Sequence, residues 1–532
     1  MNRVPQPDFQ RYMTALHCEE PDRVPLGDWH VDNLPKENFM GRPVVTLQDQ
    51  VDFWHAAGFD YTTSSSGILE PVRAPEGMTT KGDAVHTEYG HRVAREWAQE
   101  HEGVITNWEQ FAQYPWPSVD DFDLAKWDFF DRHLPSGMKA ILLLGKIYTT
   151  AWMFMGAEVF FNALESDEDL VAAVFDKIGK IQYETFLRVV AHPSVGAVLN
   201  PDDIAHNTGL LVHPRHLRKY VFPWYQKMGA VCRDQGLGFI FHSDGDCTEV
   251  MADLVDCGFQ AFNPVQPNAM DIDAVKRRWG SQLCLIGNIN LDSTLTLGTP
   301  QDVRAEVYER IRTIGPGGGY MVASSNSITD YVPLANMQAL IDATFEYGRY
   351  PIELEEGRVP GSVWKYQGKS PNGVARWESD LDVGAYAAGL LSHNVSQLVG
   401  LSQKDIAAGV DPMDVIQKGL TPAMTEVGVR FQKGEIYIPE MILAARTMAG
   451  TIDRLKDQLV GKRAKRLGRV VIGTVKGDLH DIGKNLVIMM LEGQGFSVTD
   501  LGVSVSPEKF VRAIREQNPD ILALSALLTT TM

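Results

Sequence analysis

A histidine lies between two aspartates in the stretch GTVKGDLHDIGKNLV at residues 473–487. Asp478, His480 and Gly483 form a D-x-H-x-x-G pattern that directly follows an apolar run. Imidazole is a good ligand for a transition metal, and a neighbouring carboxylate can hold the second ring nitrogen and so fix the tautomer. A phosphate-binding turn, or a helix-capping aspartate beside an incidental histidine, would use the same residue types. The secondary structure predicted around the motif is needed to choose between these alternatives.

The motif opens an alternation of strands and helices. Strands are predicted at 470–475, 496–503 and 520–528, and helices at 484–495 and 506–517. This βαβαβ order predicts a doubly wound, Rossmann-like parallel sheet whose ligand site lies at the carboxyl ends of the strands. The sequence stops five residues after Leu527, so we expect the sheet of this 463–532 domain to be incomplete.

Two further segments precede that domain. Residues 351–373 are rich in proline, glycine and charge, which predicts a linker. Residues 374–462 carry apolar side chains at three- and four-residue spacing, which predicts a small helical bundle. Pro422 and Pro439 fall where first helical turns are expected, and proline is tolerated there.

Residues 1–350 contain eight short apolar runs separated by helix-length amphipathic segments. Such an alternation predicts an α/β fold with a parallel sheet, and eight repeats predict a closed (β/α)8 TIM barrel. The predicted strands are 24–29, 59–65, 140–147, 197–203, 238–245, 261–266, 283–290 and 319–326.

Polar residues end most of these runs, and in a barrel such ends converge on one mouth. His242 and Asp244 end the fifth run and are our candidate catalytic residues. Asp202, Asp203 and His206 end the fourth and are suited to orienting a substrate. A helix N-cap is an equally open role for Asp203.

Composition restricts the class of protein. Lys and Arg number 49 and Asp and Glu 68, a net charge of −19, which argues against nucleic acid or an anionic membrane as partner. Five cysteines without a CxxC pair indicate a reducing compartment rather than a disulfide framework. The N-terminus has no apolar signal core, and no run approaches the roughly 20 apolar residues of a membrane span. We therefore expect a cytoplasmic protein.

The C-terminal motifs resemble the corrinoid-binding domains of methionine synthase and of small corrinoid proteins. Their signature is D-x-H-x-x-G, about forty residues, S-x-L and a later G-G; here 41 residues separate Gly483 from Ser525. The run PAMTEVGVRFQKGEIYIPEMILAARTM (422–448) resembles the helical cap of the same family. The later G-G is absent, which leaves a fragment or a weak corrinoid site as open alternatives.

That resemblance implies roles for individual residues. His480 would coordinate the cobalt of a cobalamin, Asp478 would orient its ring, and Gly483 would let the backbone pass close to the corrinoid. The remaining residues implied by it line the nucleotide slot or belong to the cap: Ser525, Leu527, Thr529, Met424, Phe431 and Tyr437.

The barrel resembles the uroporphyrinogen decarboxylase superfamily through DDIAHNTGLLVHPRHLRKYVFPWYQKM, FHSDGD, FNPVQPNAMDIDAVKRRWG and GPGGGYMVASSNSI. The superfamily contains decarboxylases and cobalamin-dependent methyltransferases. The arginine-rich loop of the decarboxylases is absent, since no arginine lies between Leu26 and Pro35. The methyltransferase branch often binds zinc through H-x-C, but here aspartate follows in His242-Ser243-Asp244. A harder zinc site on His242 stays open, with Cys247 and Cys284 as substitute ligands or buried apolar side chains.

The two resemblances together imply a corrinoid-dependent methyltransferase that demethylates a small methylated donor, and a methoxylated compound is the expected kind. His242 with Asp244, or a metal that they hold, would protonate or coordinate the departing heteroatom. A second methyltransferase and a corrinoid-reactivating protein are implied partners. Transfer from methyl-corrinoid to a thiol or pterin, a decarboxylase-type lyase, and a non-catalytic corrinoid carrier are the alternatives.

Overall fold

The computed structural model describes residues 6–65, 103–352, 381–459, 468–476 and 496–525, together with short stretches within 79–98 and 484–491. The chain forms two compact units. One comprises residues 1–73, 108–151 and 172–369, and the other comprises 74–107, 152–171 and 370–532. None of the described helices is both long and apolar enough to cross a membrane.

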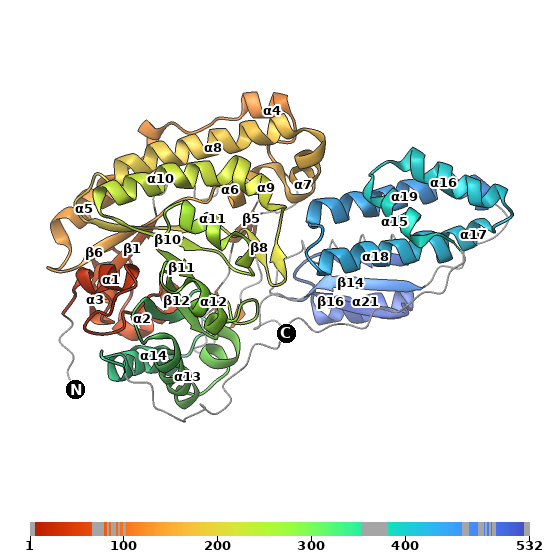
Figure 1. Ribbon diagram of the computed structural model, residues 1–532. Coiled ribbons are helices and arrows are strands. Elements are labelled where there is room, and N and C mark those ends of the chain that lie inside the picture. The colour runs from red at the N-terminus through yellow and green to blue at the C-terminus, as the bar shows by residue number, and fades with distance from the viewer. Residues whose placement is uncertain are drawn as a thin grey trace. The chain divides into compact units, whose positions relative to one another are not determined.

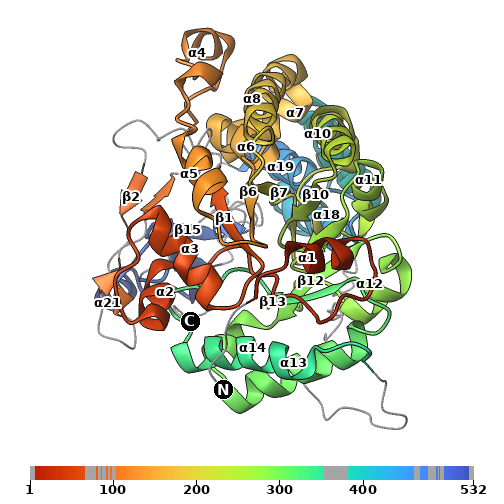
Figure 2. The same cartoon turned by 90° about the vertical axis from the view of Figure 1, so that its left-hand side faces the viewer.

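The first unit is built on a sheet of seven parallel strands, in the order β1-β6-β7-β10-β11-β12-β13. Both faces of the central strands are buried, as expected when helices cover a parallel sheet. Figure 2 shows the strands in the centre, with α8, α10, α13 and α14 outside them. The strands are β1 (Tyr61–Ser65), β6 (Lys139–Leu143), β7 (Val195–Pro201), β10 (Gly238–His242), β11 (Ala261–Asn263), β12 (Cys284–Ile289) and β13 (Tyr320–Ser324).

Seven of the eight predicted barrel strands are therefore confirmed, and the eighth is an extended segment at 24–31. It forms two isolated parallel bridges, Leu26 to Val322 of β13 and Val31 to Ile328 beyond that strand. Pro25, which has no N–H to donate, limits the ladder there. The Tyr61 hydroxyl of β1 donates to the Asp28 carbonyl at 2.7 Å, so the segment lies between the two edge strands and closes the barrel.

Gly27 is required in this segment for close packing. A Cβ at this position would lie 2.5 Å from Ile286 Cγ2 and 3.1 Å from the Met321 Cβ. The absence of a side chain allows the closing segment to approach β12 and β13.

Helices follow the strands in alternation, as the sequence predicted. Local signals fix their ends: Thr299 and Asp302 form a capping box at the start of α13. The larger helices are α1 (Phe9–Leu16), α2 (Asn33–Met40), α3 (Leu47–Ala56), α5 (Ala125–His133), α6 (Tyr148–Met155), α7 (Ala157–Ser166), α8 (Glu168–Val189), α10 (Phe222–Gln235), α11 (Met251–Asp256), α12 (Ile272–Trp279), α13 (Pro300–Ile314) and α14 (Leu334–Tyr347).

Small elements complete this part of the chain. They are the helices α4 (Trp108–Gln113) and α9 (Pro214–His216), the hairpin β8 (Ala205–His206) and β9 (Gly209–Leu210), and the antiparallel pairs β2 (Thr79–Lys81) with β5 (Glu96–Ala98) and β3 (Val85–His86) with β4 (Arg92–Val93).

The predicted helical bundle is present within residues 383–459 (Figure 1). Its core contains Tyr386, Leu398, Leu420, Met424 and Met448, all buried. Pro422 and Pro439 occupy the first turns of α18 and α19, as expected. The helices are α15 (Val383–Leu391), α16 (Val395–Ala407), α17 (Pro412–Asp414), a π-helical turn (Val415–Leu420), α18 (Thr421–Gln432) and α19 (Ile438–Leu459).

The predicted Rossmann-like sheet has three described parallel strands, in the order β15-β14-β16. They are β14 (Arg469–Thr474), β15 (Ser497–Asp500) and β16 (Ile521–Ser525). Helix α21 (Pro507–Gln517) is capped by the Ser506 side chain and packs Phe510 and Ala513 inward. Placing the first strand between the other two confirms a doubly wound start.

Candidate functional site

Several predicted site residues lie at the carboxyl ends of the barrel strands. His242 is the last residue of β10, and Asp244 follows two positions later. Asp203 lies two residues beyond β7, and Lys146 three residues beyond β6. In a barrel these ends form one mouth, which is where such folds place their chemistry.

His242 is held in one tautomer by Asn263, the last residue of β11. Asn263 Oδ1 lies 2.5 Å from His242 Nδ1, and Asn263 Nδ2 donates to the Ile286 carbonyl at 3.2 Å. Because the Asn263 amide nitrogen donates to that carbonyl, the amide oxygen faces the imidazole and accepts a hydrogen bond from Nδ1–H. The lone pair of neutral His242 therefore lies on Nε2.

Asp203, His242 and Asp244 form a compact cluster. Their potential ligand atoms all lie within 4.8 Å of one another. Lys146 Nζ lies 3.1 Å from Asp203 Oδ2, while Asp203 Oδ1 accepts the Asp244 backbone N–H at 3.2 Å. Asn326 Nδ2 donates to Asp244 Oδ2 at 2.6 Å. Asp244 Oδ1 is buried, and no described residue hydrogen-bonds it.

The surroundings shift the pKa values of Asp203 and Asp244 in opposite directions. Burial, reinforced by repulsion from Asp203, raises the pKa of Asp244 to about 8. Burial also acts to raise the pKa of Asp203, but the attraction of Lys146 and of His242 keeps it below its ordinary value. Burial lowers the pKa of His242 despite Asp203. At neutral pH the cluster thus holds a protonated Asp244, an ionised Asp203 and a neutral imidazole.

Trp29 forms an apolar wall beside the cluster. Its ring meets the His242 ring edge-on, with centroids 4.8 Å apart. A polar cluster against an aromatic face suits a small, mostly apolar molecule with one polar atom.

The predicted group of Asp202, Asp203 and His206 is divided by the structure. Asp202 is buried and accepts hydrogen bonds at 2.7–2.8 Å from the backbone N–H groups of residues 147–149, and at 2.5 Å from the Tyr225 hydroxyl. It therefore satisfies the start of α6, so the helix-capping role considered for Asp203 belongs to its neighbour. His206 contacts Thr208 within the β8–β9 hairpin.

Zinc does not fit this cluster, although three donors lie close enough to hold a cation. Burial raises the pKa of the Cys247 thiol to about 12, and Cys284 begins β12, at the end of the strand opposite the mouth. Lys146 already pairs with Asp203, and like unit charges about 4 Å apart repel by about 4 kcal/mol in a protein environment. A dication would meet this repulsion without any thiolate to offset it.

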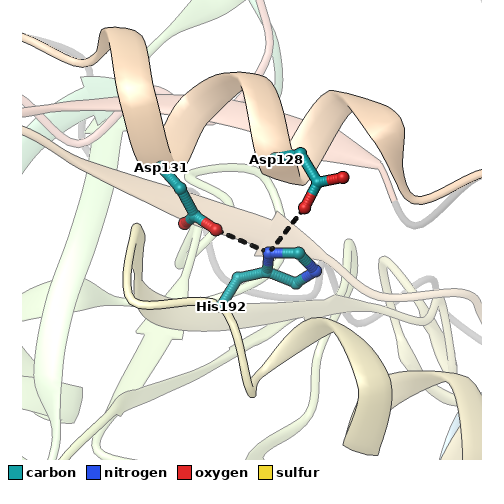
Figure 3. Close-up of side chains that lie close together, drawn as sticks. All are labelled: Asp128, Asp131 and His192. Atoms are coloured by element: carbon teal, nitrogen blue, oxygen red, sulfur yellow. Dashed lines mark hydrogen bonds and ion pairs between the residues drawn. The ribbon is translucent and has the colours of Figure 1, made fainter.

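A second carboxylate–imidazole cluster lies outside the mouth (Figure 3). His192 Nδ1 lies 2.8 Å from Asp131 Oδ2 and 3.9 Å from Asp128 Oδ1. Asp131 Oδ1 also accepts the backbone N–H of Ser194, which immediately precedes β7. This cluster ties α5 to the amino end of a strand, a position that contributes to stability in barrels.

Most of the predicted cobalt-binding motif lies outside the described residues: Asp478, His480, Gly483, Leu527 and Thr529. Ser525 is the last residue of β16 and pairs with Thr474, the last residue of β14. The strands β14 and β16 therefore end side by side, at the edge where a doubly wound fold binds its ligand.

The bundle residues predicted to contact the cofactor lie in different environments. Met424 is fully buried in the core of the bundle, whereas Phe431 is partly buried at its margin. Tyr437 is buried just before α19.

No role was predicted for Lys146, Asn263 or Asn326. Asn263 ends a strand and the other two follow one, so their position at the mouth could be predicted from the sequence. Which side chain each one contacts depends on three-dimensional placement, which strand ends alone do not give.

Comparisons with known protein families agree with this division of the chain. Residues 129–347 match the family described as uroporphyrinogen decarboxylase (URO-D). Residues 384–456 and 468–532 each match a family described as B12 binding domain.

Individual relatives match parts of the chain. Trimethylamine corrinoid protein 1 of Methanosarcina mazei is 45% identical over 129 residues, which is 24% of this chain and 60% of that protein. The chain thus spans about 60% of the length of this curated relative. A methyltransferase from Methanosarcina mazei aligns with 63% of this chain and 98% of its own, at 17% identity and a TM-score of 0.48. A cobalamin-binding protein from Desulfitobacterium hafniense aligns with 28% of this chain and 71% of its own, at 35% identity and a TM-score of 0.25.

The bundle and the small sheet are therefore B12-binding domains with cobalamin as their cofactor, and the chain joins them to a domain of the uroporphyrinogen decarboxylase superfamily.

Proposed function

We propose that the chain is a corrinoid-dependent methyltransferase that moves a methyl group from a small methoxylated donor to the cobalt of its own corrinoid. The observation that carries this proposal is the Asp203, His242 and Asp244 cluster at the mouth of a barrel joined to B12-binding domains. The curated relatives of the C-terminal domains include corrinoid proteins for trimethylamine and dimethylamine, which supports methyl transfer as the class of reaction.

The barrel site prepares the leaving group. A bound corrinoid would supply the nucleophile, a reduced cobalt, that accepts the methyl group. The electron pair of the breaking carbon–oxygen bond stays on the oxygen, which takes the proton of Asp244 and leaves as an alcohol or phenol. Asp244 Oδ1 is the unpaired, buried acid oxygen, and Asn326 holds the other oxygen in place.

His242 and Asp203 position the donor in this proposal. The Nε2 lone pair of His242 accepts a hydrogen bond from the donor, and Trp29, whose ring meets that of His242, packs against the apolar part of the donor. In the C-terminal domain, His480 would hold the cobalt and Asp478 would orient its ring, as the resemblance implies.

Decarboxylation of a polycarboxylate is the less favoured activity. The mouth presents Asp203 and Asp244, and Lys146 is already paired with Asp203. A substrate with several carboxylates would meet like charges there.

Cobalt content and methyl transfer test the proposal. The chain is incubated with hydroxocobalamin and desalted, beside His480→Ala, and we expect bound cobalt with a histidine-ligated spectrum that the substitution alters. Methyl ethers and methylamines are then screened against the reduced corrinoid for the spectrum of methyl-cobalt, with Asp244→Asn as the barrel variant. Retained cobalt with no methylation from any donor, or equal transfer by Asp244→Asn, would contradict the proposed role.

A further inference from the structure

Lys146 is the cation of the barrel mouth. Among the residues that the structure describes, it is the only lysine or arginine within ion-pair distance of Asp203, His242 or Asp244. It follows β6 in the loop that leads to α6, whose first turn is fixed by Asp202. The backbone of Lys146 thus directly precedes a capped helix start, and its ammonium group pairs with Asp203.

The Lys146 ammonium lies beside the carboxylates that would hold the cation in a metal-dependent site. Asp203 directs Oδ2 to Lys146 and Oδ1 to the Asp244 backbone, so both of its oxygens are engaged. Asp203 raises the pKa of Lys146 above its ordinary value, which keeps the ammonium charged. The residue two positions after His242 is aspartate rather than cysteine, so the soft ligand of a zinc site is replaced by an oxygen donor.

We propose that the Lys146 ammonium replaces a metal ion as the fixed positive charge of this site, and that it acts as a positioning residue which holds Asp203 in place beside Asp244. Only the effect of Lys146 on methyl transfer rests on the proposed function. The prediction that Lys146 takes the place of a metal ion does not depend on it. Removing the ammonium would release Asp203 and leave a His–Asp–Asp set with no internal cation, which is a better site for a divalent metal.

The same charge pattern indicates the class of methyl donor. The Lys146 ammonium pairs with the Asp203 carboxylate, so Asp203 offers no unpaired negative charge to attract a methylammonium ion. A neutral methyl ether needs a proton donor beside its departing oxygen, and the buried Asp244 Oδ1 has no hydrogen-bond partner among the described residues. The donor class inferred from the barrel is therefore a neutral methyl ether.

The metal arm of the test uses zinc as the probe and the full chain loaded with corrinoid. Zinc is measured by elemental analysis and by calorimetric titration in wild type, Lys146→Ala and Lys146→Ala/His242→Ala. We expect wild type to hold no stoichiometric zinc, Lys146→Ala to gain a site, and the double variant to lose it. One zinc per chain in wild type that disappears in His242→Ala would overturn the proposal, as would an absence of gained binding in Lys146→Ala.

The activity arm measures methyl transfer from a methyl ether. Lys146→Ala should lower the transfer rate on the order of 100-fold, mainly in kcat, with partial rescue by ethylammonium and partial retention in Lys146→Arg. A chelator should leave wild-type transfer unchanged, and chelator-sensitive transfer would overturn the proposal. Preference for trimethylammonium over a methyl ether would overturn the inferred donor class.

Lys139→Ala is the matched control. Lys139 begins the same strand, β6, but lies at its opposite end, where Nζ donates to the Pro193 carbonyl. It should change neither zinc binding nor transfer. If wild type itself transfers no methyl group, the function proposed above fails, while the zinc measurements still decide the role of Lys146. If Lys146→Ala does not fold, Lys146→Gln and the wild-type zinc content decide instead.

Discussion

Asn263 Oδ1 lies 2.5 Å from His242 Nδ1, at the ends of adjacent parallel strands. The register that pairs His242 with Asn263 makes this contact a property of the sheet, because both side chains point to the same face. The imidazole is therefore oriented by the barrel wall itself, and its lone pair lies on Nε2.

Replacing Asn263 with leucine should remove this control. The Nδ1–H would lose its acceptor and the imidazole would divide between tautomers, so methyl transfer should fall on the order of 10–100-fold. Nitrogen NMR of His242 and the transfer rate measure the two effects. Asn336→Leu is a matched control, because the buried Asn336 also donates to backbone carbonyls, those of Leu295 and Gly298. A loss of stability in both variants with an unchanged tautomer would refute the assignment.

Asp202 and Asp203 should behave differently on substitution. Asp202→Ala leaves three backbone N–H groups and the Tyr225 hydroxyl without an acceptor, so the barrel should lose about 3–5 kcal/mol of unfolding free energy. Asp203→Ala should lose transfer with a smaller loss of stability. Denaturant unfolding and transfer rates of both variants provide the comparison, and equal destabilisation would contradict the assigned roles.

Stability should fall as pH rises because of Asp28. Burial raises the pKa of Asp28 from about 3.8 to about 6, against two hydrogen bonds from Ser324. The folded state therefore binds a proton that the unfolded chain releases, and the stabilisation present below pH 4 is lost as pH passes 6, a difference of ~3 kcal/mol. Asp28→Asn cannot ionise, so its unfolding temperature should exceed that of wild type at pH 8 and match it near pH 4. If the difference in unfolding temperature between Asp28→Asn and wild type stayed the same from pH 4 to pH 8, the raised pKa of Asp28 would be wrong.

Thiol reagents should distinguish the cysteines. Cys232, Cys247, Cys257 and Cys284 are buried, whereas Cys18 is partly exposed. Burial raises the pKa of all five thiols, that of Cys18 included, so exposure decides which of them reacts, and native protein should be alkylated at Cys18 alone. Peptide mass spectrometry after iodoacetamide measures this, with urea-unfolded protein as the control. Rapid native labelling of Cys247 would revive a thiolate role at the mouth.

The strand ends could be predicted from the sequence, because apolar runs followed by polar residues mark the mouth of a barrel. It could not separate Asp202 from Asp203, because neighbouring residues at a strand end point to opposite sides and only the position of α6 decides which one caps it. Lys146 was visible as a polar end, but its pairing with Asp203 depends on how the loops after β6 and β7 meet. The choice between a metal and an ammonium is likewise a matter of spatial charge balance rather than of residue type.

The closing segment at 24–31 has a mechanical consequence. Five residue pairs join β12 to β13, whereas this segment has two isolated bridges, one to Val322 of β13 and one to Ile328 beyond it. Its amides should therefore exchange with solvent before those of β12 and β13. Trp29 lies in this segment with its ring against His242, so a sparsely hydrogen-bonded part of the barrel forms one wall of the site.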